Sequence, residues 1–162
     1  MQRRDFLKLT AGAALLSAVS ERASAQPLTE IRIGYQKNGV LVIARQRRAL
    51  EDHFASQSVG VKWVEFSSGP PMLEAMNVGS IHYGAVGDSP PIFAQAANAK
   101  IRYAAAVKQN GSSQAIIVPK DSPIKTLADL KGKRVAFGKG SSAHNLLVAA
   151  LEKAGAEIAA GG

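Results

Sequence analysis

The stretch VGVKWVEFSSGPPMLEAMNVGSIHYGAVGDSPPIFAQAAN, residues 59–98, presents one pattern twice. A β-rich apolar run, at residues 59–66 and again at 81–86, is followed by a polar turn and a Pro-Pro pair. Proline fits the first turn of a helix because the amide that it lacks would have no partner there. We therefore predict helices over residues 72–78 and 92–98. Strand and helix alternate across the whole stretch.

The same alternation extends to both sides of this stretch. On the N-terminal side, residues 30–35 have the pattern of a strand and residues 40–54 that of a helix. On the C-terminal side the patterns predict, in order, a strand at 101–107, a strand at 115–118, a short helix at 126–130, a strand at 134–137 and a helix at 142–154. This order indicates an α/β fold with a largely parallel sheet, in which ligands bind outside the carboxyl ends of the strands.

The first 25 residues have the three parts of an export signal. Arg3 and Arg4 supply a basic start, residues 9–19 are apolar or small on every face, and Ala23-Ser24-Ala25 is a small-x-small cleavage site. The apolar segment is shorter than the ~20 residues that a membrane-spanning helix needs, and it lacks the polar stripe of an amphipathic helix. The paired arginines resemble the twin-arginine class of signals, which implies export of folded cargo by the twin-arginine translocation machinery.

The charge and the cysteine content narrow the function classes. The chain has 20 Lys+Arg against 12 Asp+Glu, a net charge of +8, and no cysteine. Its two dense basic segments, residues 45–48 and 131–134, have no interleaved aromatic side chains, which argues against nucleic-acid binding. A positive field instead attracts small anions. Without cysteine there is no lipid-modified N-terminus, so we expect an exported, soluble, periplasmic protein without a lipid anchor.

Three strand-to-helix junctions place hydroxyl groups and backbone amides at the start of a helix. They are residues 67–70, 87–90 and 138–142. A helix N-terminus carries about half a positive charge and unpaired N–H groups, so several of them at one sheet edge could hold a sulfonate, a phosphate or a carboxylate. Helix capping alone also explains Ser and Asp at such positions. The sequence leaves both explanations open.

Catalytic and metal sites find little support in the sequence. Ser142 and His144 are two residues apart on a predicted helix, so their side chains point away from each other and do not form a nucleophile and base pair. Residues 138–141 contain the letters of a phosphate-binding loop without its spacing. His53, His82 and His144 are scattered and have no metal-ligand spacing. His144 alone lies in the first turn of a candidate binding helix, where it could contact an anion or have a structural role.

Four blocks of the sequence resemble the aliphatic sulfonate-binding proteins of ABC importers, and together they cover nearly all of residues 30–155. The blocks are Ile31 to Lys37, Trp63 to Gly87 with its run Leu73 to Ile81, Gly87 to Ala96, and Lys139 to His144. The resemblance implies a periplasmic protein with the type II two-lobed clamshell fold. Such a protein captures a sulfonate between its lobes, without a cofactor or metal and without covalent chemistry, and delivers it to a membrane permease.

The resemblance also transfers binding roles to residues that follow each strand or open the last helix. These residues are Gln36, Lys37, Ser68, Gly69, Asp88, Ser89, Ser141, Ser142 and His144. The four serine hydroxyl groups would meet the sulfonate oxygens, while Asp88 would organise its loop rather than touch an anion that it repels. His82 departs from the family, whose members usually carry an acid after Gly-Ser-Ile, and we expect it to alter a surface rather than the cleft.

The same resemblance divides the chain into an export signal at 1–25, a first lobe at 26–107, a crossover linker at 108–114 and the start of a second lobe at 115–162. Proteins of this family continue well beyond this length. We therefore expect the first lobe to be largely present, the second to be incomplete and poorly ordered or in need of a partner, and ligand binding by this chain to be weak or absent.

Other members of the wider family bind taurine, nitrate or pyrimidine precursors. Another small anion is therefore an alternative to an aliphatic sulfonate, as is an inactive fragment. An enzyme similar to the pyrimidine-precursor synthases is a further alternative, and the absence of cysteine and the scattered histidines oppose it.

Overall fold

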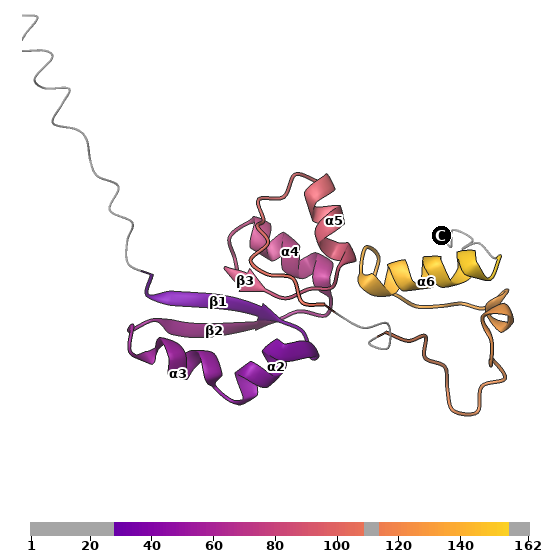
Figure 1. The fold of residues 1–162 in the computed structure, drawn as a ribbon, viewed down its shortest axis with the longest axis horizontal. Helices are drawn as coiled ribbons and strands as arrows, with labels where there is room; N and C mark the ends of the chain where they lie inside the picture. The colour runs from indigo at the N-terminus through magenta and orange to yellow at the C-terminus, as the bar shows by residue number, and fades with distance from the viewer. Residues whose placement is uncertain (1–27, 109–113, 156–162) are drawn as a thin grey trace, which may run out of the picture.

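The structure of the protein is a computed structural model that describes residues 28–108 and 114–155. Its centre is a parallel sheet of three strands in the order β2-β1-β3 (Figure 1). The strands are β1, Glu30–Tyr35, β2, Gly60–Glu65, and β3, Tyr83–Gly84. β1 pairs with β2 along its whole length and with β3 at Ile33 and Gly34. The first strand of the sequence is therefore the central one.

Helices lie on both sides of this sheet. α2 and α3 follow β1 and lie on one side of the β1–β2 pair, while α4 and α5 lie with β3 on the other side (Figure 1). A short 3-10 helix, η3, and a longer helix, α6, come from the last part of the described chain. The bounds are Gly39–Gln46 for α2, Ala49–Ala55 for α3, Gly69–Asn77 for α4, Ser89–Ala96 for α5, Leu127–Leu130 for η3 and Ser142–Lys153 for α6.

One face of the sheet holds an apolar core with α2. Ile33 and Tyr35 of β1 are buried together with Leu41 of α2. The ring of Trp63 meets that of Tyr35 edge to face, with 5.9 Å between the centroids, and the Tyr35 hydroxyl donates to Glu65 Oε2 at 2.9 Å. Fully burying a large apolar side chain contributes about 1.5–3 kcal/mol, so this cluster holds β1 and β2 against their helices.

The opposite face is packed around Gly34, whose missing side chain makes room for two neighbours. A Cβ at this position would lie 2.7 Å from Ile81 Cδ1 and 3.0 Å from Met72 Cγ. Met72 of α4 is 0 % exposed and Ile81, which precedes β3, is 2 % exposed. Glycine in the central strand thus lets α4 and the β3 segment approach the backbone closely.

Most of the predicted elements are present. The strands at 30–35 and 59–66, the helices that begin at the two proline pairs and the helix at 142–154 are confirmed to within a few residues, and the short helix at 126–130 is η3. The helix predicted over 40–54 is instead two helices. Arg48 adopts a left-handed backbone, with φ of 54°, and this conformation cannot continue a right-handed helix.

Four predicted strands are shortened or missing. The strand at 81–86 is reduced to Tyr83–Gly84. The other three, which pair with no neighbour in the described part of the chain, are residues 101–107, 115–118 and 134–137. The N–H and C=O groups of a strand need a neighbouring strand as a partner, and the described residues supply none for these segments. Apolar side chains in them are accordingly exposed, Val107 by 76 % and Ile117 by 89 %.

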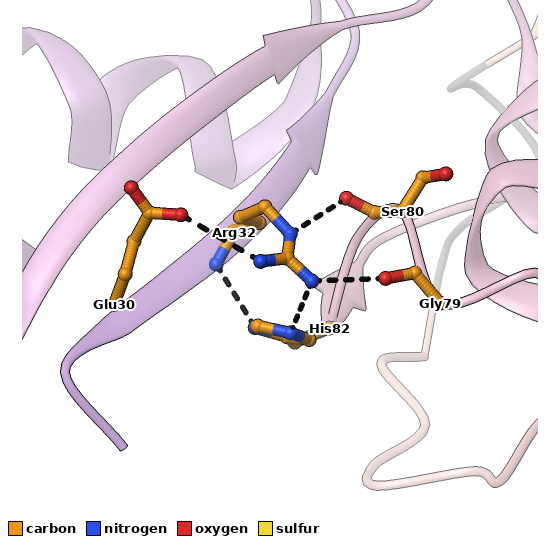
Figure 2. Close-up of polar contacts among 5 residues, drawn as sticks. All are labelled: Glu30, Arg32, Gly79, Ser80 and His82. Carbon is orange, nitrogen blue, oxygen red and sulfur yellow. Dashed lines mark hydrogen bonds and ion pairs between the residues drawn. The ribbon is translucent and has the colours of Figure 1, made fainter.

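Arg32 ties β1 to the turn that leads into β3 (Figure 2). Its side chain donates to two backbone carbonyls, from Nε to Ser80 O at 2.8 Å and from Nη2 to Gly79 O at 2.9 Å. Nη2 also lies 2.7 Å from His82 Nε2, and Nη1 lies 3.6 Å from Glu30 Oε1. His82 is exposed, and the hydrogen bonds that the structure gives its ring are with Arg32 rather than with a predicted site residue.

Replacing Arg32 with Gln should lower the free energy of unfolding by about 1–2 kcal/mol, because the Gly79 and Ser80 carbonyls lose a charged donor. Urea unfolding followed by circular dichroism measures the change. Lys62→Gln on β2 is the matched control, since it removes the same charge from a side chain without an ion pair among the described residues. It should change the stability by less than about 0.5 kcal/mol. Equal losses in both variants would contradict the role of Arg32.

Among the residues that the structure describes, amide hydrogen exchange should be slowest in β1 and β2 and fastest in residues 114–141. The first two segments share a continuous ladder of hydrogen bonds, whereas the third has only a 3-10 helix and turns. Local opening costs least where few backbone bonds and buried contacts must break. Mass spectrometry of the exchanging chain tests this order, and uniformly strong protection through Leu151 would count against it.

Candidate functional site

The loops that follow the three strands lie at one edge of the sheet, because parallel strands share the direction in which they end. Gln36 and Lys37 follow β1, Ser68 and Gly69 follow β2, and Asp88 follows β3. Each loop leads directly into a helix, α2, α4 or α5. Six of the nine predicted site residues belong to this edge, because Ser89, directly after Asp88, opens α5 as Gly69 opens α4.

The N-terminus of α6 joins this edge through Asp88. Ser142 Oγ donates to Asp88 Oδ1 at 3.1 Å, across 54 positions of sequence. The same carboxylate oxygen accepts from the Ser89 amide at 2.8 Å and from Ser89 Oγ at 3.2 Å. One oxygen atom thus receives three hydrogen bonds from two helices, and it holds the start of α5 and the start of α6 together.

The loop before α6 packs against the other two loops. Gly87 meets Ser142 so closely that a Cβ on Gly87 would overlap the Ser142 hydroxyl. A Cβ on Gly138 would lie 3.9 Å from the Cβ of Ser68, and one on Gly140 would lie 3.7 Å from Pro70 Cγ. The structure therefore brings together the junctions at 67–70, 87–90 and 138–142.

His144 is held in the first turn of α6 by contacts on both sides. Its amide donates to Ser141 Oγ at 3.3 Å, and its Nδ1 accepts from the Gly140 amide at 3.3 Å. Its ring stacks on Phe137 with 4.8 Å between centroids and an angle of 12°. Because Nδ1 is an acceptor here, the proton of the neutral ring sits on Nε2, which can donate to a ligand. Phe137 was not among the predicted site residues, since its segment had the pattern of a strand.

The three helix N-termini differ in how many amides they offer. Pro70 and Pro71 occupy the first turn of α4, and Pro90 and Pro91 occupy that of α5, so each of these helices lacks two N–H donors there. At α6 the amides of Ser142 and Ala143 lie in the first turn with no acceptor inside the helix. The three junctions therefore do not contribute backbone amides equally, and α6 offers more free amides than α4 or α5.

Gln36 and Lys37 stand beside this cluster rather than within it. Gln36 Nε2 donates to the carbonyl of Ala85 at 3.4 Å, which connects the loops after β1 and β3. Lys37 Nζ lies 3.2 Å from Glu65 Oε1 and is largely exposed. Both line an open hollow of about 280 Å³ with Asn38, Glu65, Phe66 and Ser67. The ammonium group of Lys37 is thus paired with a carboxylate that the sequence analysis did not anticipate.

Asp88 is an anion in this setting. The hydrogen bond from the Ser142 hydroxyl, together with those from the Ser89 hydroxyl and amide, lowers the pKa of its carboxyl group, although partial burial acts against them. Ser89 and Ser141 are buried beside it, 5 % and 9 % exposed, while Asp88 itself is exposed. The cluster therefore combines one negative charge with several hydroxyl and amide donors.

The described residues contain no group of three His, Cys, Asp or Glu side chains arranged to hold a metal ion. Nor does any helix among them have the length and apolar character required to cross a membrane.

A parallel α/β sheet with hydroxyl-bearing helix N-termini at its carboxyl edge is the architecture of a small-ligand receptor. The chain belongs to a family of such receptors, described as the periplasmic phosphonate substrate-binding proteins of ABC transporters, whose model matches residues 38–160. The predicted family and fold class are confirmed. Members of this family are binding components of transporters rather than enzymes.

Individual relatives are close. A protein of Escherichia coli that is named for binding aliphatic sulfonates is 49% identical over 154 residues, 94% of this chain and 47% of that protein. The alkanesulfonate-binding protein SsuA from Xanthomonas axonopodis pv. citri, solved with bound MOPS, superposes with a TM-score of 0.73 at 51% identity over 83% of this chain and 46% of its own. The taurine-binding periplasmic protein of Escherichia coli is 30% identical over 85% of this chain and 42% of that protein. The chain spans about half the length of the curated relatives it matches.

Acid should weaken the contact between α6 and the loop before α5. Hydrogen bonds lower the pKa of Asp88, so its contribution to stability is complete above about pH 4, the ordinary value of aspartate, and is lost as the pH falls through the lower folded value. NMR signals of the amides at the start of α6, followed from about pH 7 to about pH 2, measure this transition.

Asp88→Asn should remove the transition at α6. Asp129→Asn is the control, because Asp129 also has a lowered pKa but bonds only to the Lys125 and Thr126 amides and the Thr126 hydroxyl near η3. If α6 responded to acid equally in both variants, Asp88 would not be the group that titrates.

Proposed function

We propose that this protein is the solute-binding component of an ABC importer, which captures aliphatic sulfonates in the periplasm and delivers them to a permease at the inner membrane. The observation that carries the proposal is the convergence of Ser68, Ser89, Ser141 and Ser142 at one sheet edge around the N-terminus of α6. The family and its sulfonate-binding relatives support the same ligand class.

A sulfonate fits the donors that the edge provides. It carries one negative charge on three oxygens, accepts hydrogen bonds and has no proton to give. The structure gives Ser68 no side-chain capping bond, and the Ser141 hydroxyl uses only its oxygen toward His144. These two hydroxyl protons, the α6 amides and His144 Nε2 are therefore the donors for the anion. The Ser89 and Ser142 hydroxyl protons are directed to Asp88 and become available only if the hydroxyl groups rotate.

Taurine or nitrate is the second candidate ligand. The taurine-binding relative favours it, and taurine presents the same sulfonate group to the same donors.

We propose that the protein does not catalyse a reaction and is not an enzyme of the pyrimidine-precursor synthase type. Ser142 Oγ donates to a carboxylate rather than to a histidine, and His144 Nδ1 accepts a backbone amide, so neither is arranged as a nucleophile with its base.

The export and domain assignments belong to the same proposal. We infer that residues 1–25, which lie outside the described residues, are a twin-arginine signal that directs the protein to the periplasm. Residues 26–107 form the first lobe, 108–114 the crossover and 115–162 the beginning of the second lobe. The grouping of the sheet with α2, α3, α4 and α5 inside residues 30–96 supports the first boundary.

Ser142→Ala should weaken the binding of ethanesulfonate by between about twofold and about tenfold, because Asp88 loses the hydroxyl donor that holds the start of α6, with its free amides, against the loop before α5. NMR titration of the complete chain measures the dissociation constant and is sensitive to weak binding. Ser56→Ala, after α3 and exposed, is the matched control and should leave the constant unchanged. If no signal moved with ethanesulfonate, taurine or nitrate, the proposed function would be wrong.

A further inference from the structure

We propose that Asp88 sets the charge selectivity of the site, so that a singly charged alkanesulfonate is bound in preference to a doubly charged alkylphosphonate of the same shape. This inference rests on the proposed function and adds to it the residue that chooses between two ligand classes. Both ligand classes are relevant to this chain, because its family is described by phosphonate binding and its close relatives are named for sulfonate binding.

The carboxylate of Asp88 lies beside the N-terminus of α6. Asp88 Oδ1 lies 3.1 Å from Ser142 Oγ, which belongs to the helix N-terminus with the most available amides. An anion oxygen that accepts a hydrogen bond from the Ser142 hydroxyl or amide lies about 3 Å from that residue. When the hydroxyl group rotates from Asp88 to donate to the anion, such an oxygen is within about 6 Å of Asp88 Oδ1. The bound anion and the carboxylate are near neighbours.

Asp88 has no ion-pair partner among the described residues, and only the partial positive charges of the helix N-termini beside it offset its charge. The ion pairs found among the described residues are Arg32 with Glu30 and Lys37 with Glu65, and neither includes Asp88. Its hydrogen-bond partners are hydroxyl groups and an amide, which are neutral. These donors keep the pKa of the carboxyl low, so the group stays charged at neutral pH. Its field therefore reaches an anion at the start of α6.

The repulsion between the Asp88 carboxylate and a bound anion is large enough to change the dissociation constant. Two unit charges about 6 Å apart repel each other. This repulsion weakens binding about threefold at the dielectric constant of water, ~80, and about a hundredfold at an effective dielectric constant of ~20. Asp88 is exposed, so the lower part of this range applies. A dianion meets this repulsion twice and a monoanion once. The head groups of sulfonate and phosphonate each have three oxygens and are alike in shape, so the site distinguishes them mainly by their charge.

The test compares ethanesulfonate with ethylphosphonate in the wild-type chain and in Asp88→Asn, which keeps the shape of the side chain and removes its charge. Ligand-observed NMR of the complete chain, at a pH where the phosphonate is a dianion, gives both dissociation constants. The dissociation constant of ethylphosphonate divided by that of ethanesulfonate should be at least about threefold lower in Asp88→Asn than in the wild-type chain. An unchanged ratio would overturn the inference.

Two further variants separate charge from structure. Asp52→Asn changes the net charge of the protein equally but belongs to α3, which lies away from α5 and α6 (Figure 1), and it should leave the ratio unchanged. Ser142→Ala removes a neutral donor, so it should weaken both ligands by a similar factor and also leave the ratio unchanged. If Ser142→Ala shifted the ratio as much as Asp88→Asn, Asp88 would act through structure rather than charge, and the inference would be wrong.

The same data distinguish this inference from the proposed function. Binding of ethanesulfonate with an unchanged ratio leaves the function standing and removes the role of Asp88. Tighter binding of ethylphosphonate than of ethanesulfonate by the wild-type chain contradicts both the sulfonate assignment and the selectivity. Absence of binding to either compound in the wild type contradicts the function and, with it, the inference.

Discussion

The parallel pairing of β1 with β2 and β3 is the constraint on which the rest of the structure depends. All three strands therefore end at the same edge of the sheet. The loops that lead from them into α2, α4 and α5 begin at that edge. The tight packing of Met72 and Ile81 on Gly34 fixes α4 and β3 beside the central strand. As a result, Ser68 and Asp88, which are 20 positions apart in the sequence, open neighbouring helices at the same edge.

The same constraint explains why the later part of the chain is less regular than its sequence suggests. A strand gains its stability from the neighbour to which it bonds, whereas a helix satisfies its own backbone. Residues 115–118 and 134–137 have apolar character suited to a sheet, yet the described residues place no strand beside them. α6 forms nevertheless, with Ser141 capping its first turn and Leu147 buried. Its attachment to the sheet therefore depends on the loop contacts at its N-terminus.

Local patterns were sufficient for the elements whose stability is local or whose partners are nearby in sequence. The proline pairs marked the starts of α4 and α5, and alternating apolar residues marked β1 and β2. The break at Arg48 could not be read from the sequence, because a left-handed conformation in a non-glycine residue depends on tertiary packing. In the candidate site, the pairing of Lys37 with Glu65 and the stacking of His144 on Phe137 join residues from different elements. Spacing along the chain carries no signal for such contacts.

The hydrogen bonds at Asp88 give the site a property that helix N-termini alone do not have. A cluster of donors without a carboxylate would leave its hydroxyl groups and amides without partners. Here the Asp88 carboxylate already accepts hydrogen bonds from the Ser89 and Ser142 hydroxyl groups. The proline pairs reduce the number of competing amides at α4 and α5, which leaves α6 as the principal amide source. While these bonds are kept, an incoming anion uses donors that Asp88 does not hold, and it does so within reach of the carboxylate charge. A site organised in this way favours ligands that accept several hydrogen bonds while carrying little charge, and this combination is the chemistry of a sulfonate group.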